Sequence, residues 1–228
     1  MFRVTQYLQE VHRPTPLAAR RAPSGPVVIW HLIRRCNLMC KHCYSISGDV
    51  DFPGELSTAE VFSVMDDLKA FRVPVLILSG GEPLLRRDIF DISHRAKAKG
   101  FYVGLSSNGT LITRDNIDAI ADVDYNYVGV SLDGIGATHD SFRRRDGAFA
   151  EALAGLLLCR DRNLKTGMRF TMTMDNAAEF PKLLDLMEVE GIDKFYLSHL
   201  VYAGRGNKNR GDDAHHAFTR RVMDVLFD

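Results

Sequence analysis

Short apolar runs alternate with longer amphipathic segments from residue 27 onward. Strands are predicted at Val27–Ile33, Pro74–Leu78, Phe101–Leu105, Tyr127–Leu132, Gly167–Thr173 and Lys194–Ser198. Helices are predicted between them at Thr58–Phe71, Ile89–Lys99, Arg114–Ala121, Ala148–Arg162 and Ala178–Glu190, with a sixth from about Asp212. Because each strand is followed by a helix, this order predicts an α/β fold built on a parallel sheet.

Local signals support the helix boundaries. Ser57, with Glu60 three residues later, is typical of a capping box. Gly100 and Gly191 stand where two helices are expected to end.

The first 26 residues have a different composition. They contain Pro14, Pro16, Pro23 and Pro26, together with Arg13, Arg20 and Arg21. Since proline interrupts both helices and central strands, we expect residues 1–26 to form an N-terminal Pro/Arg-rich arm, and residues 27–228 to form the core.

The composition excludes several classes of protein. The 29 basic and 29 acidic residues cancel, and 46% of the chain is apolar, which is typical of a globular domain. A neutral chain has no net field to attract nucleic acid or an anionic membrane. The longest apolar stretches, such as Ala152–Cys159, are too short to span a bilayer, and Met1–Glu10 does not resemble a signal peptide. We therefore expect a cytoplasmic protein with no membrane or nucleic-acid partner.

Three of the four cysteines, Cys36, Cys40 and Cys43, lie within eight positions. Such clusters in a reducing compartment more often bind metal than form disulfides. Cys159 lies among leucines in a predicted helix, so we interpret it as a core residue. Three thiolates on a four-iron cube leave one iron open to a ligand. The alternative is a zinc ion with His42 as fourth ligand.

The chemically distinctive residues follow the predicted strands. The cysteines follow the first strand, Ser79–Pro83 the second, Ser106–Gly109 the third and Ser131–Gly134 the fourth. The carboxyl ends of parallel strands share one face of the sheet, where ligands bind. These loops are therefore expected to converge on one site.

The Cys-x3-Cys-x2-Cys motif after the first strand and Gly80-Gly81-Glu82-Pro83 after the second resemble the radical S-adenosylmethionine (SAM) superfamily, over about Val27–Leu200. The resemblance implies a partial (β/α)6 barrel of the TIM type and a [4Fe–4S] cluster on Cys36, Cys40 and Cys43. It further implies that the open iron binds the amino and carboxylate groups of SAM. Reductive cleavage of SAM would then give methionine and a 5′-deoxyadenosyl radical.

The loop after the second strand suits a SAM site. Gly80 and Gly81 have no side chain, so backbone can come close to a cofactor. Glu82 is expected to accept a hydrogen bond from the ammonium group of SAM.

Four further SAM-binding residues are implied by the resemblance. Ser131 is expected to contact the SAM carboxylate or ribose, and Asn108 to border the SAM pocket. His42 matches a position that packs near adenine, and Arg143 a position that binds a carboxylate.

Within the superfamily, several segments resemble the radical SAM enzymes of heme d1 biosynthesis. They are Phe2–Leu8, Val27–Cys36, Lys41–Ser47, Phe71–Pro83 and His199–Gly206. This implies a siroheme-type tetrapyrrole substrate whose propionate side chains are modified, and an electron donor such as flavodoxin or ferredoxin. The alternatives are a related enzyme of alternative heme synthesis, a peptide-modifying enzyme, or a non-catalytic fragment that binds SAM and the cluster.

The tetrapyrrole carboxylates would need cations, and the basic residues expected near the mouth are Arg143, Arg144, Arg145, Arg205, Lys208 and Arg210. His199 is the histidine best placed to ligate substrate iron. Related enzymes continue into a C-terminal domain with an auxiliary cluster. No cysteine follows Cys159, so we expect this domain to be absent.

Overall fold

A computed structural model describes residues 2–12, 25–214 and 216–225 of the chain. Its strands are β1 (Phe2–Arg3), β2 (Val27–His31), β3 (Val75–Ser79), β4 (Tyr102–Ser107), β5 (Tyr127–Ser131), β6 (Thr166–Met172) and β7 (Lys194–His199). Its α-helices are α1 (Val4–His12), α2 (Thr58–Ala70), α3 (Ile89–Ala98), α4 (Ile117–Asp122), α5 (Ala137–Arg143), α6 (Ala148–Asp161), α7 (Phe180–Val189), α8 (Gly204–Lys208) and α9 (His216–Asp224).

The described residues form one sheet with the strand order β1-β7-β6-β5-β4-β3-β2. Strands β2 to β7 are parallel neighbours in chain order, and β1 adds to β7 in the antiparallel direction. Strands β1 and β2 lie at opposite edges, so the sheet is an open, partial barrel. The predicted α/β fold with six parallel strands is confirmed.

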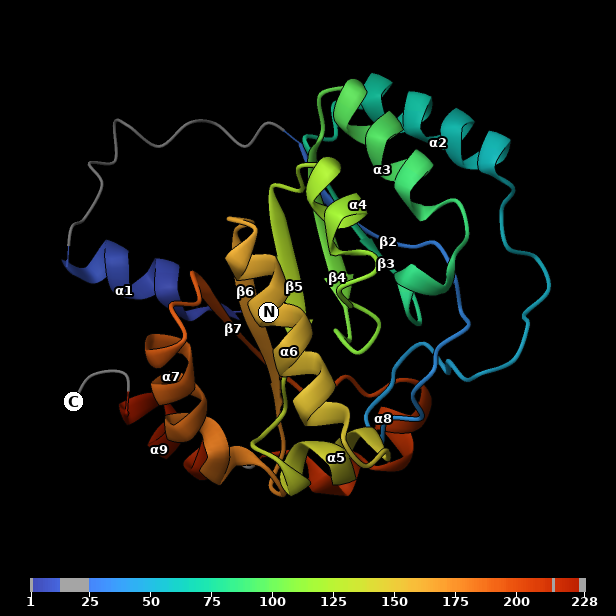
Figure 1. Ribbon diagram of the computed structural model, residues 1–228. Coiled ribbons are helices and arrows are strands. Elements are labelled where there is room, and N and C mark those ends of the chain that lie inside the picture. The colour runs from blue at the N-terminus through green and yellow to red at the C-terminus, as the bar shows by residue number, and fades with distance from the viewer. Residues whose placement is uncertain (1, 13–24, 215, 226–228) are drawn as a thin grey trace.

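Helices cover the outer face of this sheet. Figure 1 shows α3, α4 and α6 lying across the strands on one side. Strand residues that point to this side are fully buried, for example Leu76, Leu78 and Leu105. Near β7, Phe170, Phe180 and Phe195 pack together, with 5.5 Å between the last two ring centroids. Burial of this apolar face holds the layers together.

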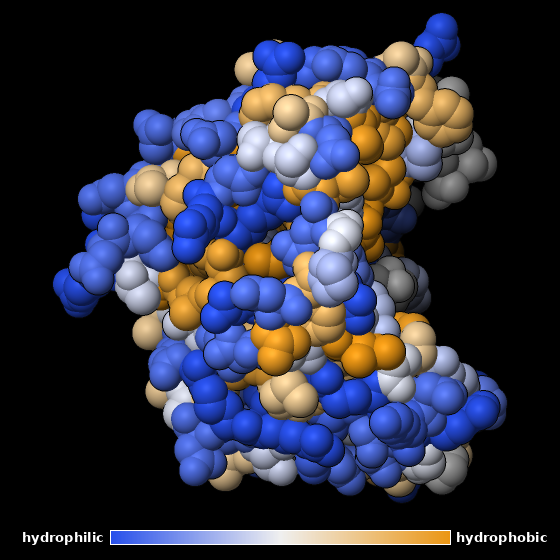
Figure 2. Space-filling view, turned by 90° about the vertical axis from the view of Figure 1, so that its right-hand side faces the viewer, coloured by the Kyte–Doolittle hydropathy of each residue, from blue (hydrophilic) through white to orange (hydrophobic). Residues whose placement is uncertain are grey.

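The inner face is open along the β2 edge. Along this strand, Val27 and Ile29 point to one face, and Val28 and Trp30 point to the other. Val27 is 60% exposed and Ile29 is 55% exposed. Figure 2 shows hydrophobic side chains on the wall of a hollow that opens at one side of the molecule.

The N-terminal arm is only partly as expected. The prediction of no helix is wrong over Val4–His12, which forms α1, and Phe2–Arg3 pairs with β7. Val4 is buried in the main core. All four prolines of the segment follow residue 12, so the first turns are free to become helical. Residues 13–24 lie outside the described residues.

The helix-end signals are confirmed. Ser57 and Glu60 form the predicted capping box, and Gly100 and Gly191 have φ angles of 73° and 63°. Helices α5 and α8, which lie in the loops after β5 and β7, were not predicted because each is short. No helix within the described ranges is long and apolar enough to cross a bilayer.

Candidate active site

A cavity of about 290 Å³ lies at the carboxyl ends of the parallel strands. The predicted site residues that line it are Cys36, Cys40, His42, Cys43, Gly80, Gly81, Asn108, Ser131 and Arg143. Residues from the loops after β2, β3, β4 and β5 thus meet at one mouth, as the strand order requires. Of the predicted cofactor-binding residues, Glu82 alone does not line the cavity.

The cysteine loop starts beyond β2 and folds back on itself. The Cys36 N–H donates to the Gly48 carbonyl at 2.9 Å, which closes the loop. Cys36, Cys40 and Cys43 pack together around Leu38, and none of them forms a disulfide. Burial raises the pKa of the Cys36 thiol to about 12. Burial acts the same way on Cys43, but hydrogen bonds to Ser45 and Ser47 outweigh it and lower the pKa of Cys43.

Donors from elsewhere in the barrel point at two of the sulfurs. The Asn108 amide Nδ2 lies 3.8 Å from Cys36 Sγ, and Arg143 Nη1 lies 3.5 Å from Cys40 Sγ. Such contacts stabilise negative charge on a thiolate. These two donors favour negative charge on Cys36 and Cys40, against the burial that opposes it at Cys36.

The thiols do not form a site for one small ion. Within the described part of the chain, no three His, Cys, Asp or Glu side chains are arranged to hold a single metal ion. His42 instead stacks on Phe142, with 4.4 Å between ring centroids, and burial lowers its pKa. This geometry does not favour zinc with His42 as a ligand. A [4Fe–4S] cluster would need only the three thiols, which line one cavity.

Gly80 and Gly81 allow two loops to touch. A Cβ atom on Gly80 would lie 2.3 Å from the Ile33 carbonyl oxygen, and one on Gly81 would lie 2.3 Å from that of Arg35. The Gly81 and Glu82 N–H groups donate to these same carbonyls at 2.6 Å and 2.9 Å. The glycines therefore join the loop after β3 to the start of the cysteine loop, in addition to lining the cavity.

Glu82 is fully buried beneath the cavity. Its carboxylate accepts hydrogen bonds from the Leu84 N–H, the Ser107 hydroxyl and the Asn108 N–H, at 2.7–3.1 Å. Burial raises the pKa of Glu82, although the three hydrogen bonds act to lower it. In this arrangement Glu82 positions Asn108 and the loop after β4, and its contact with SAM stays a prediction.

Arg143 is buried and already has partners. Its guanidinium forms an ion pair with Asp133, in addition to its contact with Cys40. Burial opposes the charge, but Asp133 and Cys40 outweigh it and raise the pKa of Arg143. The neighbouring arginines lie outside the cavity lining: Arg144 is exposed, and Arg145 pairs with Glu151.

Arg205 also lines the cavity, but it is bound to the cysteine loop. Its Nε donates to the Cys40 carbonyl and its Nη1 to the Ser47 carbonyl, both at 2.7 Å. Lys208 and Arg210 are exposed and do not line the cavity. Of the basic residues expected near the mouth, Arg143 and Arg205 line the cavity, and both already have partners. His199 is exposed and lines the mouth.

A family model described as the radical SAM superfamily matches residues 30–187. The chain belongs to the radical SAM superfamily. The match covers the cysteine loop, the Gly-Gly-Glu-Pro loop and strands β3 to β6.

Two relatives within this superfamily act on tetrapyrroles, as their names state. The chain is 55% identical over 99% of its length to the pre-heme d1 synthase of Dinoroseobacter shibae, of which it covers 56%. It is 44% identical over 94% of its length to the Fe-coproporphyrin III synthase of Methanosarcina barkeri, of which it covers 54%. The chain thus spans about half the length of these relatives.

Among solved structures, SuiB of Streptococcus suis bound to S-adenosylmethionine superposes with a TM-score of 0.76. The two are 16% identical, and the alignment covers 90% of this chain and 48% of SuiB. This likeness confirms the partial-barrel fold.

Several cavity residues escaped the sequence analysis, and Arg169 is the charged one among them. Arg169 lies on β6 and reaches the cavity from inside the barrel. The signal was present: Met168, Phe170 and Met172 alternate toward the core, which turns Arg169 and Thr171 to the other face.

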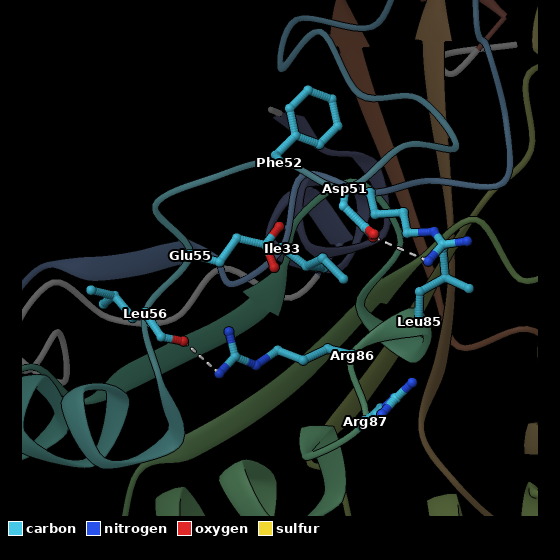
Figure 3. Close-up of a pocket in the computed structure, with 9 residues that line it drawn as sticks. Ile33, Asp51, Phe52, Glu55, Leu56, Leu85, Arg86 and Arg87 are labelled. Atoms are coloured by element: carbon cyan, nitrogen blue, oxygen red, sulfur yellow. Dashed lines mark hydrogen bonds and ion pairs between the residues drawn. The ribbon is translucent and has the colours of Figure 1, made fainter.

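A second cavity, of about 440 Å³, lies beside the cysteine loop (Figure 3). Arg86 crosses it and donates to the carbonyls of Leu32 and Leu56 at 2.8 Å and 2.9 Å. Its Nε also pairs with Asp88 at 2.7 Å. Arg86 therefore connects the residue that follows β2 to the segment before α2. The residues around this second cavity stabilise the fold beside the cysteine loop and do not line the candidate active site.

Proposed function

We propose that this chain is the SAM- and cluster-binding part of a radical SAM enzyme of heme d1 biosynthesis. Its substrate would be a siroheme-derived tetrapyrrole, and the propionate side chains would be modified. The identity of 55% to a pre-heme d1 synthase over nearly the whole chain carries the choice of substrate. The three thiols in one cavity with the Gly80–Gly81 loop support the chemistry.

Cys36, Cys40 and Cys43 would hold a [4Fe–4S] cluster. When bound, this cluster supplies the electron that cleaves SAM into methionine and a 5′-deoxyadenosyl radical. Asn108 and Arg143 would stabilise the cluster through their contacts with the ligating sulfurs, which makes it easier to reduce.

SAM would bind in the same cavity. The backbone of Gly80 and Gly81 would receive its methionine end, and the Ser131 hydroxyl its carboxylate or ribose. His42, stacked on Phe142, would border the adenine. Glu82 would act from beneath by fixing the Asn108 loop.

Two partners complete the proposal. The tetrapyrrole would enter from the mouth, where the exposed His199 would ligate its iron. A flavodoxin or a ferredoxin would deliver the electron.

The test uses anaerobically purified chain reconstituted with iron and sulfide. We expect an oxygen-sensitive brown chromophore, and 5′-deoxyadenosine when SAM and dithionite are added. Alanine at Cys36, Cys40 or Cys43 should abolish both, whereas Cys159→Ala should keep both because Cys159 is a core residue on the buried face of α6. Stoichiometric zinc in place of iron would contradict the proposal.

The substrate is tested by titration with an iron-containing siroheme-type tetrapyrrole. A shift of its Soret band is expected on binding. SAM cleavage without any such shift would favour the peptide-modifying alternative.

A further inference from the structure

Arg169 carries a positive charge on the inner face of the barrel. Its Nη1 donates to the Ser106 hydroxyl, and its Nη2 donates to the Ser131 hydroxyl at 3.1 Å. Its Nε is buried without a hydrogen-bond partner. No carboxylate among the described residues pairs with this guanidinium, although the structure gives ion pairs for many other basic side chains.

The other two arginines at the cavity are held in other ways, although Arg205 also lacks a carboxylate partner and its Nη2 is likewise buried without a hydrogen bond. Arg143 is neutralised by Asp133, and Arg205 is bound to carbonyls of the cysteine loop. Arg169 donates to two neutral hydroxyls, and the buried Glu82 carboxylate acts on it through space without forming an ion pair. A carboxylate adds opposite charge and a two-pronged geometry that matches the guanidinium, which a neutral hydroxyl lacks, so an entering carboxylate would displace these hydroxyls.

The surroundings of Arg169 are suited to such a ligand. Five neighbouring strands each place a hydroxyl group toward the cavity near their carboxyl ends: Ser79, Ser106, Ser131, Thr171 and Ser198. Ser79 contacts Ser106 at 3.3 Å, and Thr171 contacts Ser198 at 3.2 Å, so these side chains bond mainly to one another. Hydroxyls can rotate to donate to the oxygens of a carboxylate that Arg169 holds.

We propose that Arg169 binds one carboxylate of the substrate. Arg169 would therefore select substrates that have a carboxylate-bearing side chain long enough to reach into the barrel. This inference rests on the proposed function, since a siroheme-type tetrapyrrole carries several carboxylates on its rim. A carboxylate on Arg169 would place the carbon atoms next to it in the cavity that the three thiols line. The loop arginines would then not be the main anchors.

The competing ligand is the carboxylate of SAM, because Ser131 contacts Arg169. The two ligands are separated by measuring them independently. Tetrapyrrole affinity is measured by Soret titration, and SAM affinity by equilibrium dialysis, both on reconstituted protein without dithionite.

The variants are Arg169→Gln and Arg169→Lys, with Lys208→Gln as the control that removes one exposed positive charge. We expect Arg169→Gln to weaken tetrapyrrole binding by about tenfold or more, since a hydrogen bond to a charged group contributes about 1.5–3 kcal/mol. Arg169→Lys should fall between the wild type and Arg169→Gln. SAM affinity and iron content should stay at the wild-type level in all three variants.

A second ligand tests whether Arg169 acts on the negative charge of the tetrapyrrole carboxylates. A tetrapyrrole whose carboxylates are methyl esters should bind wild type and Arg169→Gln equally. Unchanged tetrapyrrole affinity in Arg169→Gln, or a loss of SAM affinity alone, would overturn this inference and leave the proposed function standing. Absence of any Soret shift in the wild type would overturn both.

Discussion

His139 is a buried histidine next to the arginine that contacts the cysteine loop. It is fully buried, and its Nδ1 accepts a hydrogen bond from the Asp133 N–H at 3.0 Å. A protonated ring could not accept this bond. Burial, and then the charge of Arg143, lower the pKa of His139 to about 3.

This environment predicts a pH-dependent stability. Between pH 6.5 and pH 3 the unfolded chain binds a proton at residue 139 that the folded chain does not bind. Stability should therefore fall as pH falls below 6.5, by about 1.4 kcal/mol per pH unit from this one group. From pH 7.5 to pH 5 the wild type should lose about 2 kcal/mol more than His139→Gln in urea unfolding. The exposed His94→Gln should keep the wild-type slope, and equal slopes for all three proteins would contradict the assignment.

At the scale of the strands, three glycines leave room for the aromatic ring of Tyr127. Gly104, Gly129 and Gly167 lie on adjacent strands around the Tyr127 side chain. A Cβ atom on Gly167 would lie 2.5 Å from Tyr127 Cε2, and one on Gly129 would lie 2.6 Å from the Tyr127 hydroxyl oxygen. Tyr127 thus fills the inside of the sheet below the hydroxyls of the cavity.

Gly167→Ala should therefore overpack the inside of the barrel. We expect a loss of about 1–3 kcal/mol in the free energy of unfolding. Tyr127→Ala opens the space, so the double variant should lose less than the sum of the two single losses, with a coupling of about 1 kcal/mol or more. Urea unfolding of the four proteins measures this coupling. Gly211→Ala is the control, because nothing lies within 4 Å of the added Cβ. Strictly additive losses would show that the ring moves aside.

At the scale of the whole molecule, the segment after the last strand holds the loop after the first parallel strand. The Arg205 N–H donates to the Cys43 carbonyl at 2.8 Å, and the Arg205 side chain donates to Cys40 and Ser47. Asn209 Nδ2 donates to the Lys41 carbonyl at 2.7 Å. A Cβ atom on Gly204 would lie 2.6 Å from the Cys43 carbonyl oxygen, so the backbones touch. The cysteine loop thus takes its shape only when the barrel is complete.

Arg205→Met should weaken this closure. Two loop carbonyls would lose their donors, at a cost of about 1–3 kcal/mol for each group left unpaired. We expect less iron per chain after reconstitution and faster loss of the chromophore in air, while Lys208→Met should match the wild type. Full iron content with weaker tetrapyrrole binding would instead show that Arg205 is a substrate anchor.

The sequence by itself determined the features that depend on near neighbours. Periodicity located six parallel strands, Ser57 and Glu60 located a helix start, and the spacing of Cys36, Cys40 and Cys43 identified the family. These features are local, because side chains a few residues apart share one face or one loop.

The tertiary structure decided which side chains meet. Strand β1 pairs with β7, Arg205 reaches the cysteine loop, and Glu82 lies beneath the cavity instead of in it. It also decided the partners of the arginines at the cavity. Arg143 forms an ion pair with Asp133, whereas Arg169 donates to two hydroxyls. Charge compensation and burial depend on neighbours that are far apart in the chain, and only the closed packing of the barrel brings those neighbours together.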